Sequence, residues 1–253
     1  MLDCPTPEML HYIEKMLPRS GNISVEVFIG KFSGPARARN EGLKGVTTPF
    51  IAFWDSDDQP DIEKIVRMVN ETDLNRSSLI IGGFEILTNG STPRKFRTSS
   101  LTQVATNPGL WRCLVSTSLL NGITFPDLRL GEDQVFLAKI LESGPKVIFK
   151  DEILYRYHYG GFNQLTSTRN FNPILQANHL TRIIGKTAKD KEIRKFLVTL
   201  QIKQLLTLLL RGNYKVKSIA TIRIFTTIYN SPKFSINAIR DIFQTPTNEK
   251  FNV

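Results

Sequence analysis

Three aspartates, Asp55, Asp57 and Asp58, fall within four residues directly after the apolar run 50–54. Carboxylates this close repel one another and resist burial unless a cation offsets their charge. Mg²⁺ and Mn²⁺ prefer oxygen ligands, take one or two carboxylates, and complete their shells with water and substrate phosphates. The cluster therefore predicts a metal and diphosphate site or, as the alternative, a solvated acidic turn with Asp61 near the start of the next helix.

Two further pairs of residues have types that suit the same chemistry. Glu132 and Asp133 follow Gly131 and open an apolar segment with helical spacing. The helix dipole favours carboxylates there, and a carboxylate in hydrogen-bond reach of a hydroxyl can take its proton. Arg39 and Asn40 stand at an expected junction of loop and helix, where the arginine either meets a phosphate or carboxylate or lies on the surface. Each pair alone is a weak signal.

The elements that must position these residues alternate between helix and strand in the first 172 residues. Apolar spacing predicts helices over 6–17, 36–44, 62–69 and 110–120, with another starting at 132. It predicts strands over 23–29, 50–54, 79–87, 146–149 and 153–157. Ligands bind beyond the carboxyl ends of strands in open α/β sheets, so the acids after 50–54 lie where chemistry is expected.

Two tryptophans adjoin the candidate motifs. Trp54 precedes the acidic cluster and is expected in the core, whereas Trp111 either stacks on a sugar or base or is itself a core residue. Cys113 is expected to be a small buried residue in the 110–120 helix. With Cys4 it makes only two cysteines, too few for a disulfide framework or a cysteine-built zinc site, which favours a reducing compartment.

The charge of the chain is concentrated in its last third. The 253 residues are 41% apolar and 22% charged, a globular composition, with a net charge of +10. Residues 1–172 hold 19 basic and 19 acidic side chains, whereas 173–253 hold 14 basic and 4 acidic ones. This change of composition near Asn172-Pro173 predicts two units, 1–172 and 173–253.

The basic unit is predicted to be helical, with apolar faces over 196–210 and 216–229. Such helices either lie on an anionic membrane or pack on the rest of the protein. No RNP, KH, zinc-finger or phosphate-loop pattern supports nucleic acid as a partner. No signal peptide or spanning segment is visible, so we expect a cytoplasmic protein, with peripheral membrane contact as an open alternative.

Taken in order, the motifs resemble those of the family 2 glycosyltransferases with the A-type fold. The resemblance covers residues 5 to about 168. It rests on Ala38 to Gly42, Thr48 to Asp58, Ile123 to Pro126 with Gly131 to Asp133, and Ile153 to Tyr157. It implies an α/β fold in which a Rossmann-like mixed sheet is flanked by helices, here followed by the basic helical region.

The resemblance also implies roles for the acids. Asp57 would be the metal ligand for Mn²⁺ or Mg²⁺, Asp55 would assist at the metal or nucleotide, and Asp58 would be an accessory acid. Asp133 would be the catalytic base, and Glu132 would orient the acceptor or the loop. One base and one metal suffice for a single displacement with inversion.

The implied substrates are a nucleotide-diphosphate sugar as donor and a glycan or lipid-linked hydroxyl as acceptor. Arg39, Asn40, Asp55 and Trp111 are the implied substrate-binding residues, in a hexosyltransferase-like enzyme of polysaccharide or glycan synthesis. Two departures from the family pattern stand out: the first strand is missing or truncated, and 30–35 has no acid where the family has an Asp-Asp-Gly-Ser segment. These departures leave open the alternative that the chain is a non-catalytic protein that binds a glycan, a membrane or a partner enzyme.

Overall fold

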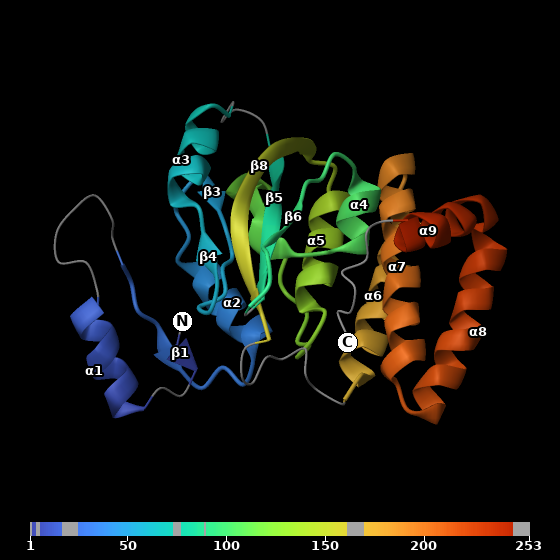
Figure 1. The fold of residues 1–253 in the computed structure, drawn as a ribbon, viewed down its shortest axis with the longest axis horizontal. Coiled ribbons are helices and arrows are strands. Elements are labelled where there is room, and N and C mark those ends of the chain that lie inside the picture. The colour runs from blue at the N-terminus through green and yellow to red at the C-terminus, as the bar shows by residue number, and fades with distance from the viewer. Residues whose placement is uncertain are drawn as a thin grey trace.

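The computed structural model describes residues 2–3, 6–16, 25–72, 77–88, 90–160 and 170–244. A curved mixed sheet lies in the middle of the molecule, with α1 and β1 at one end and a stack of C-terminal helices at the other (Figure 1). The small pair β1 (Leu2–Asp3) and β2 (Ile29–Gly30) is parallel and separate from the main sheet.

Two long neighbouring strands, β5 and β8, form the centre of the main sheet. The strand order is β3-β7-β5-β8-β4, with β6 also paired to β5. β5 and β8 run parallel, and the other pairs are antiparallel. The strands are β3 (Phe50–Ile51), β4 (Gln59–Pro60), β5 (Ser78–Thr88), β6 (Arg94–Phe96), β7 (Cys113–Ser116) and β8 (Lys146–Tyr159).

In the described ranges, five helices accompany the strands and four follow them. The first five are α1 (Pro7–Met16), α2 (Pro35–Lys44), α3 (Ile62–Asn70), α4 (Leu101–Thr106) and α5 (Glu132–Glu142). The last four are α6 (Asn172–Thr187), α7 (Lys191–Arg211), α8 (Tyr214–Asn230) and α9 (Pro232–Gln244). Side-chain N-caps begin several of them, because an oxygen at that position accepts from an otherwise unpaired backbone N–H, as Asp190 does for α7.

The main hydrophobic core joins the sheet to the C-terminal helices. It contains Val115 of β7 and Phe136 of α5, and it continues into Phe196, Leu197 and Leu200 of α7, all at most 1% exposed. Burial of such side chains is worth roughly 1.5–3 kcal/mol each, so α7 is tied firmly to the sheet. The helix predicted over 196–210 is confirmed, and of the two alternatives left open for it this part of α7 follows packing on the rest of the protein, because it is mostly core.

Most of the other predicted elements are confirmed. The helices 36–44 and 62–69, the helix starting at 132 and the strand 79–87 all occur. The first helix is present up to Met16, while Leu17 lies outside the described residues. The predicted pair 146–149 and 153–157 is one continuous strand, β8, with an irregular register opposite Ile81 to Phe84.

The helix predicted over 110–120 is wrong. This stretch folds as a turn (Leu110–Arg112), the strand β7 and a second turn (Thr117–Leu120). β7 lies between β3 and β5, so every residue of it is buried and its apolar run carries no alternation. A short apolar run of this kind fits a buried strand as well as a buried helix. Cys113 is buried as expected, but in a strand.

The strands predicted over 23–29 and 50–54 are each reduced to two residues. Residues 25–28 are not strand, and 23–24 lie outside the described residues. Within the described residues only β1 pairs with this segment, so the side chains of Val25, Val27 and Ile29 are exposed. β3 is an edge strand paired with β7, and Phe50 and Ile51 are half-buried rather than buried. The acidic cluster therefore follows a short edge strand.

Candidate active site

Arg39 connects the two acidic motifs. Its Nη2 donates to Oδ1 of Asp55 at 2.9 Å and its Nη1 donates to Oε1 of Glu132 at 2.6 Å. Arg39 comes from α2, Asp55 follows β3, and Glu132 is the first residue of α5. The guanidinium carbon also lies 5.6 Å from the ring centroid of Phe125. Three motifs that are far apart in the sequence therefore meet at one cation.

The electrostatics of this bridge favour its charged form. Burial works against the Arg39 charge, but the neighbouring carboxylates outweigh it, so the pKa of Arg39 is raised above its ordinary value. The side chain of Glu132 is 7% exposed, and burial raises its pKa while Arg39 acts in the opposite direction. Glu132 is thus a buried acid that depends on one arginine for its negative charge.

Asp133 is the titratable group whose surroundings suit a proton acceptor. Burial, followed by the negative charge of Glu132, raises the pKa of Asp133 to about 7. It stands in the first turn of α5 behind Gly131, which has φ of 83° and whose added Cβ would lie 3.0 Å from Cβ of Ala177. A side chain at 131 would strain this start, so the glycine sets where the two acids leave the loop.

Asn40 supports the loop that leads to these acids. Its Nδ2 donates to the Phe125 carbonyl at 2.9 Å, and its Oδ1 accepts from the Phe125 N–H at 2.8 Å. Both polar atoms of the side chain are engaged with the loop. The structure therefore places Asn40 beside Arg39 as a support of the Glu132 segment, and its contact with a substrate stays a prediction.

The acidic cluster forms a turn closed by the Asp58 N–H, which donates to the Asp55 carbonyl at 3.3 Å. The Asp58 side chain is 1% exposed, whereas Asp57 is exposed. Asp58 accepts from the Tyr155 hydroxyl and from the His158 N–H, each at 2.7 Å. Burial raises the pKa of Asp58, and these two hydrogen bonds partly offset it.

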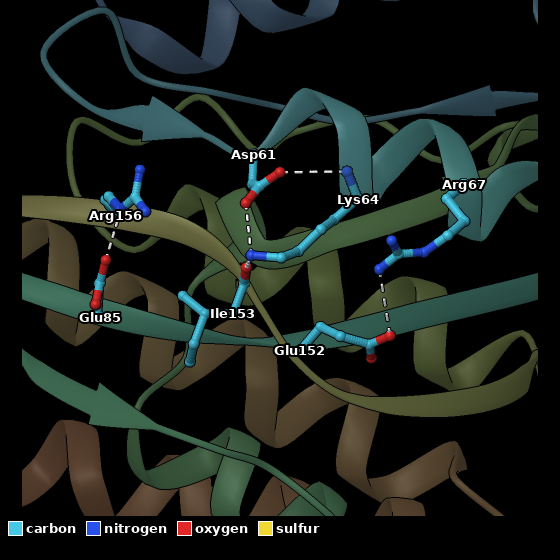
Figure 2. A network of polar contacts seen from close by, with 7 residues as sticks. All are labelled: Asp61, Lys64, Arg67, Glu85, Glu152, Ile153 and Arg156. Carbon is cyan, nitrogen blue, oxygen red and sulfur yellow. Dashed lines mark hydrogen bonds and ion pairs between the residues drawn. The ribbon is translucent and has the colours of Figure 1, made fainter.

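A network of polar contacts attaches the end of this segment to β8 (Figure 2). Asp61 caps α3 by accepting from the Lys64 N–H at 3.2 Å, and its own N–H donates to the Leu154 carbonyl at 2.9 Å. Nζ of Lys64 binds Oδ2 of Asp61 at 2.6 Å and the Ile153 carbonyl at 3.3 Å. The acidic turn and the start of α3 are therefore held against one strand.

A groove of about 590 Å³ lies beside this network. It is lined by Lys64, Glu85, Lys95, Arg97, Asp151, Glu152, Ile153 and Arg156. Arg156 pairs with Glu85 at 2.6 Å and Arg97 with Asp151 at 3.3 Å, so much of its charge is already compensated. Side chains alternate along a strand, so Arg156 points to the opposite face of the sheet from Tyr155 and the acidic turn.

Residues 1–126 match the sequence profile of Glycosyl transferase family 2. This part of the chain belongs to that family. The solved structure of S. aureus TarS 1-349 in complex with UDP-GlcNAc is similar over 96% of this chain and 70% of that chain, with a TM-score of 0.66 and 20% identity. S. aureus TarS 1-349 matches over 96% and 69%, with a TM-score of 0.61 and 20% identity. A search of curated proteins found no match.

These comparisons confirm the fold expected from the motifs. At 20% identity the likeness to TarS shows the architecture, and together with the family match it establishes the A-type glycosyltransferase fold. The matched region of family 2 ends at residue 126, before Glu132 and Asp133. The connection of the Glu-Asp pair to the family region therefore comes from the structure, through Arg39.

The acids of this family 2 domain offer a limited set of metal ligands. Within the described ranges no three His, Cys, Asp or Glu side chains lie close enough together to form a metal cage. Asp57 is exposed, and in the described part no hydrogen bond or ion pair engages its carboxylate. The side chain of Asp55 is 39% exposed, and one of its carboxylate oxygens pairs with Arg39. Such a pair fits an ion that takes two carboxylates and fills its shell with phosphate and water.

The two tryptophans differ from each other in their surroundings. Trp54 is 40% exposed, so the prediction that it belongs to the core is wrong: the edge strand before it leaves it at the surface. Trp111 lies in an aromatic cluster, stacked on Tyr155 at 4.7 Å and on Tyr157 at 5.8 Å between ring centroids. Its contact with a substrate stays a prediction.

Tyr155 is the site residue to which no role was assigned from the sequence. Its hydroxyl accepts from the Asp55 N–H at 3.2 Å as well as donating to Asp58. The alternation of Ile153 to Tyr157 places Tyr155 and Tyr157 on one face of β8, and that signal was visible. What the pattern does not contain is which face meets the acidic turn.

Proposed function

We propose that this chain is an inverting glycosyltransferase that moves a sugar from a nucleotide-diphosphate sugar to a hydroxyl of a glycan or lipid-linked acceptor. The observation that carries the proposal is the Arg39 bridge, which brings the acidic turn and the Glu-Asp pair into one site. Membership of family 2 over residues 1–126 and the similarity to TarS, solved with UDP-GlcNAc, support a nucleotide sugar as donor.

Asp133 is proposed as the base. An acceptor hydroxyl must lose its proton as it attacks the anomeric carbon, and a base is most effective when its pKa lies near the working pH. The pKa of Asp133, about 7, meets this condition, because burial and Glu132 oppose its negative charge. Glu132, held by Arg39, is proposed to orient the acceptor or the loop. A single displacement by this route inverts the anomeric centre and needs no covalent intermediate on the enzyme.

The acidic turn is proposed to hold the donor diphosphate. Asp57 and Asp55 would bind Mn²⁺ or Mg²⁺, which when bound neutralises the charge that develops on the leaving diphosphate. Asp55 would also orient the donor through its contact with Arg39. Asp58 has a different task in this proposal: its carboxylate is buried and bonded to β8, so it holds the turn in place rather than reaching the substrate.

The decisive experiment is a screen of nucleotide sugars for Mn²⁺-dependent binding by calorimetry, with UDP-GlcNAc included because TarS was solved with it. Binding that requires the metal, followed by transfer to a glycan acceptor with inverted product stereochemistry, is the expected result. A full-length chain that binds no nucleotide sugar with or without metal would contradict the proposal. It would favour the non-catalytic alternative, a glycosyltransferase-like protein that binds a glycan, a membrane or a partner.

We further propose that α8 makes peripheral contact with an anionic membrane. Its outer side bears Tyr214, Ile222, Phe225 and Tyr229, which are 88%, 66%, 69% and 86% exposed. Lys215 and Lys217 are exposed beside this stripe. No helix in the described ranges is long and apolar enough to cross a bilayer. Figure 1 shows α8 at the outer edge of the helical end.

The membrane contact is tested by flotation on phosphatidylglycerol vesicles at low salt. Each lysine near such a surface contributes about 1 kcal/mol, and the apolar stripe adds buried area. The full chain should float, the double variant Ile222→Ser with Phe225→Ser should not, and 0.5 M salt should weaken flotation. Equal behaviour of the chain and the variant would show that the stripe is not the membrane contact.

A further inference from the structure

The hydroxyl of Tyr155 lies between the two ends of the acidic turn. It accepts a hydrogen bond from the backbone N–H of Asp55 at 3.2 Å and donates one to Oδ2 of Asp58 at 2.7 Å. A phenolic hydroxyl has one proton to give, and here that proton goes to a carboxylate that is 1% exposed. One oxygen atom therefore links the first and the last residue of the turn.

The position of this hydroxyl is set by packing. Tyr155 is 1% exposed, and its ring stacks on Trp111 with centroids 4.7 Å apart and planes 19° apart. Trp111 in turn packs in a T-shaped arrangement with Phe84, with ring centroids 4.8 Å apart. The phenol cannot swing to another position without disturbing this cluster, so its oxygen is a fixed point for the turn.

The other contacts between the turn and β8 do not replace this link. Asp58 also accepts from the His158 N–H at 2.7 Å, and β4 pairs with β8 at Arg156 and Tyr155. These contacts hold the last residue of the turn and the residues after it. The backbone N–H of the first residue, Asp55, donates to the Tyr155 hydroxyl, and its carboxylate accepts from Arg39. Asp57 lies between the two points that Tyr155 joins.

We propose that Tyr155 is a positioning residue for metal and donor binding, acting through Asp58 and the Asp55 backbone. The inference rests on the proposed function, in which Asp55 and Asp57 bind the ion. Three like charges in a turn of four residues favour its spreading apart, and the buried hydroxyl that joins its ends opposes that movement together with the Asp58 N–H, which donates to the Asp55 carbonyl at 3.3 Å. In this proposal the Tyr155 hydroxyl supports the donor site by ordering the turn and is not itself a ligand of the metal or the sugar.

The chain supplies a matched control. Tyr157 lies two residues further along β8, on the same face, and stacks on the same Trp111 with centroids 5.8 Å apart and planes 10° apart. In the described part of the chain no hydrogen bond joins its hydroxyl to the acidic turn, although burial and, after it, the charges of the three aspartates raise the pKa of Tyr157. Tyr155→Phe and Tyr157→Phe therefore remove the same atom from the same aromatic cluster. They differ in whether that atom holds Asp55 and Asp58.

The experiment compares both variants with the wild type as full-length chains. Hydrogen exchange of peptides covering 53–58 reports the order of the turn without any ligand. Calorimetry with UDP-GlcNAc and titrated Mn²⁺ reports the metal-dependent affinity. Loss of a hydrogen bond to a charged group changes an equilibrium constant by roughly tenfold or more. We expect about this increase in exchange and in Kd for Tyr155→Phe, and changes within about twofold for Tyr157→Phe.

A third variant tests whether Tyr155 acts through its carboxylate partner. If it does, the loss of donor affinity caused by Tyr155→Phe should be smaller in the Asp58→Asn background than in the wild-type background. Equal exchange and equal affinity in Tyr155→Phe and Tyr157→Phe would overturn the proposal. A wild type that binds no nucleotide sugar would refute the proposed function and, with it, the role of Tyr155 in donor binding. Hydrogen exchange alone would then decide whether Tyr155 holds the turn. Faster exchange in Tyr155→Phe would support that role, and equal exchange would refute it.

Discussion

The two halves of the candidate site are held by different kinds of force. Glu132 and Asp133 begin α5, whose following residues, including Phe136 and Ala138, are fully buried in the main core. The acidic turn follows the two-residue edge strand β3 and is held by separate hydrogen bonds to β8 and by Arg39. Packing fixes the half with the proposed base, Glu132 and Asp133 (the base half), with many small contacts, whereas the half proposed to bind the donor, residues 55–58 (the donor half), depends on a few polar ones.

This difference predicts different consequences for the two halves. A substitution in the base half should change rate or titration and leave donor affinity nearly unaltered, because the surrounding core keeps its shape. A substitution in the donor half should change affinity first, because each polar contact there carries a larger share of the geometry.

The largest expected effect is on turnover in Asp133→Asn. The amide keeps the shape of the carboxylate but cannot accept the acceptor's proton, so kcat should fall by about 10²–10⁴-fold. Steady-state kinetics with the donor and acceptor identified by the screen measures this, and calorimetry should find donor and Mn²⁺ affinity within a few-fold of wild type. Near wild-type turnover would place the base elsewhere.

The next effect is on donor affinity in Asp57→Ala. The exposed Asp57 carboxylate is the proposed ligand with no competing partner in the described structure, so its loss should weaken Mn²⁺-dependent binding of the nucleotide sugar identified by the screen by roughly 10–100-fold. Glu63→Ala, an exposed acid on the nearby α3, is the control and should leave the affinity unaltered. Full metal-dependent affinity in Asp57→Ala would remove the metal assignment.

A smaller effect is expected where the two halves meet. Arg39→Gln removes the cation that favours the charged forms of Glu132 and Asp133, so their pKa values should rise further. The acidic limb of the pH profile of kcat, set by deprotonation of the base, should therefore move to higher pH. Activity measured from pH 5 to 9 checks this, and an acidic limb at the wild-type pH would show that Arg39 does not tune the base.

The sequence predicted the helix that carries Glu132 better than the strand before Asp55, and the reason is local. The Glu132 helix and the strand 79–87 have clear periodicity, and both are confirmed. The 110–120 stretch is an interior strand between two turns, and an apolar run alone does not distinguish such a strand from a helix.

The contacts that assemble the site have no local signal. Arg39 was predicted as a substrate-binding residue, but its two carboxylate partners lie 16 and 93 positions away. Tyr155 reaches Asp55 across 100 positions. Such pairs follow from the topology of the sheet, in which β8 lies beside β4, and that strand order is not contained in any single motif.

The smallest effect is one of stability, and it tests whether burial does raise the pKa of Asp133. The folded-state pKa is about 7, against 3.8 as the ordinary value, so between about pH 4 and pH 7 the native state binds more protons than the unfolded state. The contribution of Asp133 to the free energy of unfolding must then fall as the pH rises through this window. An amide at this position does not titrate, so the Asp133→Asn variant would have no such dependence.

Asp133→Asn should therefore melt at nearly the wild-type temperature at pH 4 and a few degrees higher at about pH 8, where the wild type carries a half-buried charge. Thermal unfolding in EDTA, followed by circular dichroism across this range, measures the difference without metal at the nearby acids. Asp127→Asn is the control: its exposed carboxylate pairs with Arg37, which lowers its pKa, so that variant should lose stability near neutral pH instead. A gain for Asp133→Asn that is equal at pH 4 and pH 8 would mean that the amide merely packs better. Burial would then not be the cause of the raised pKa of Asp133.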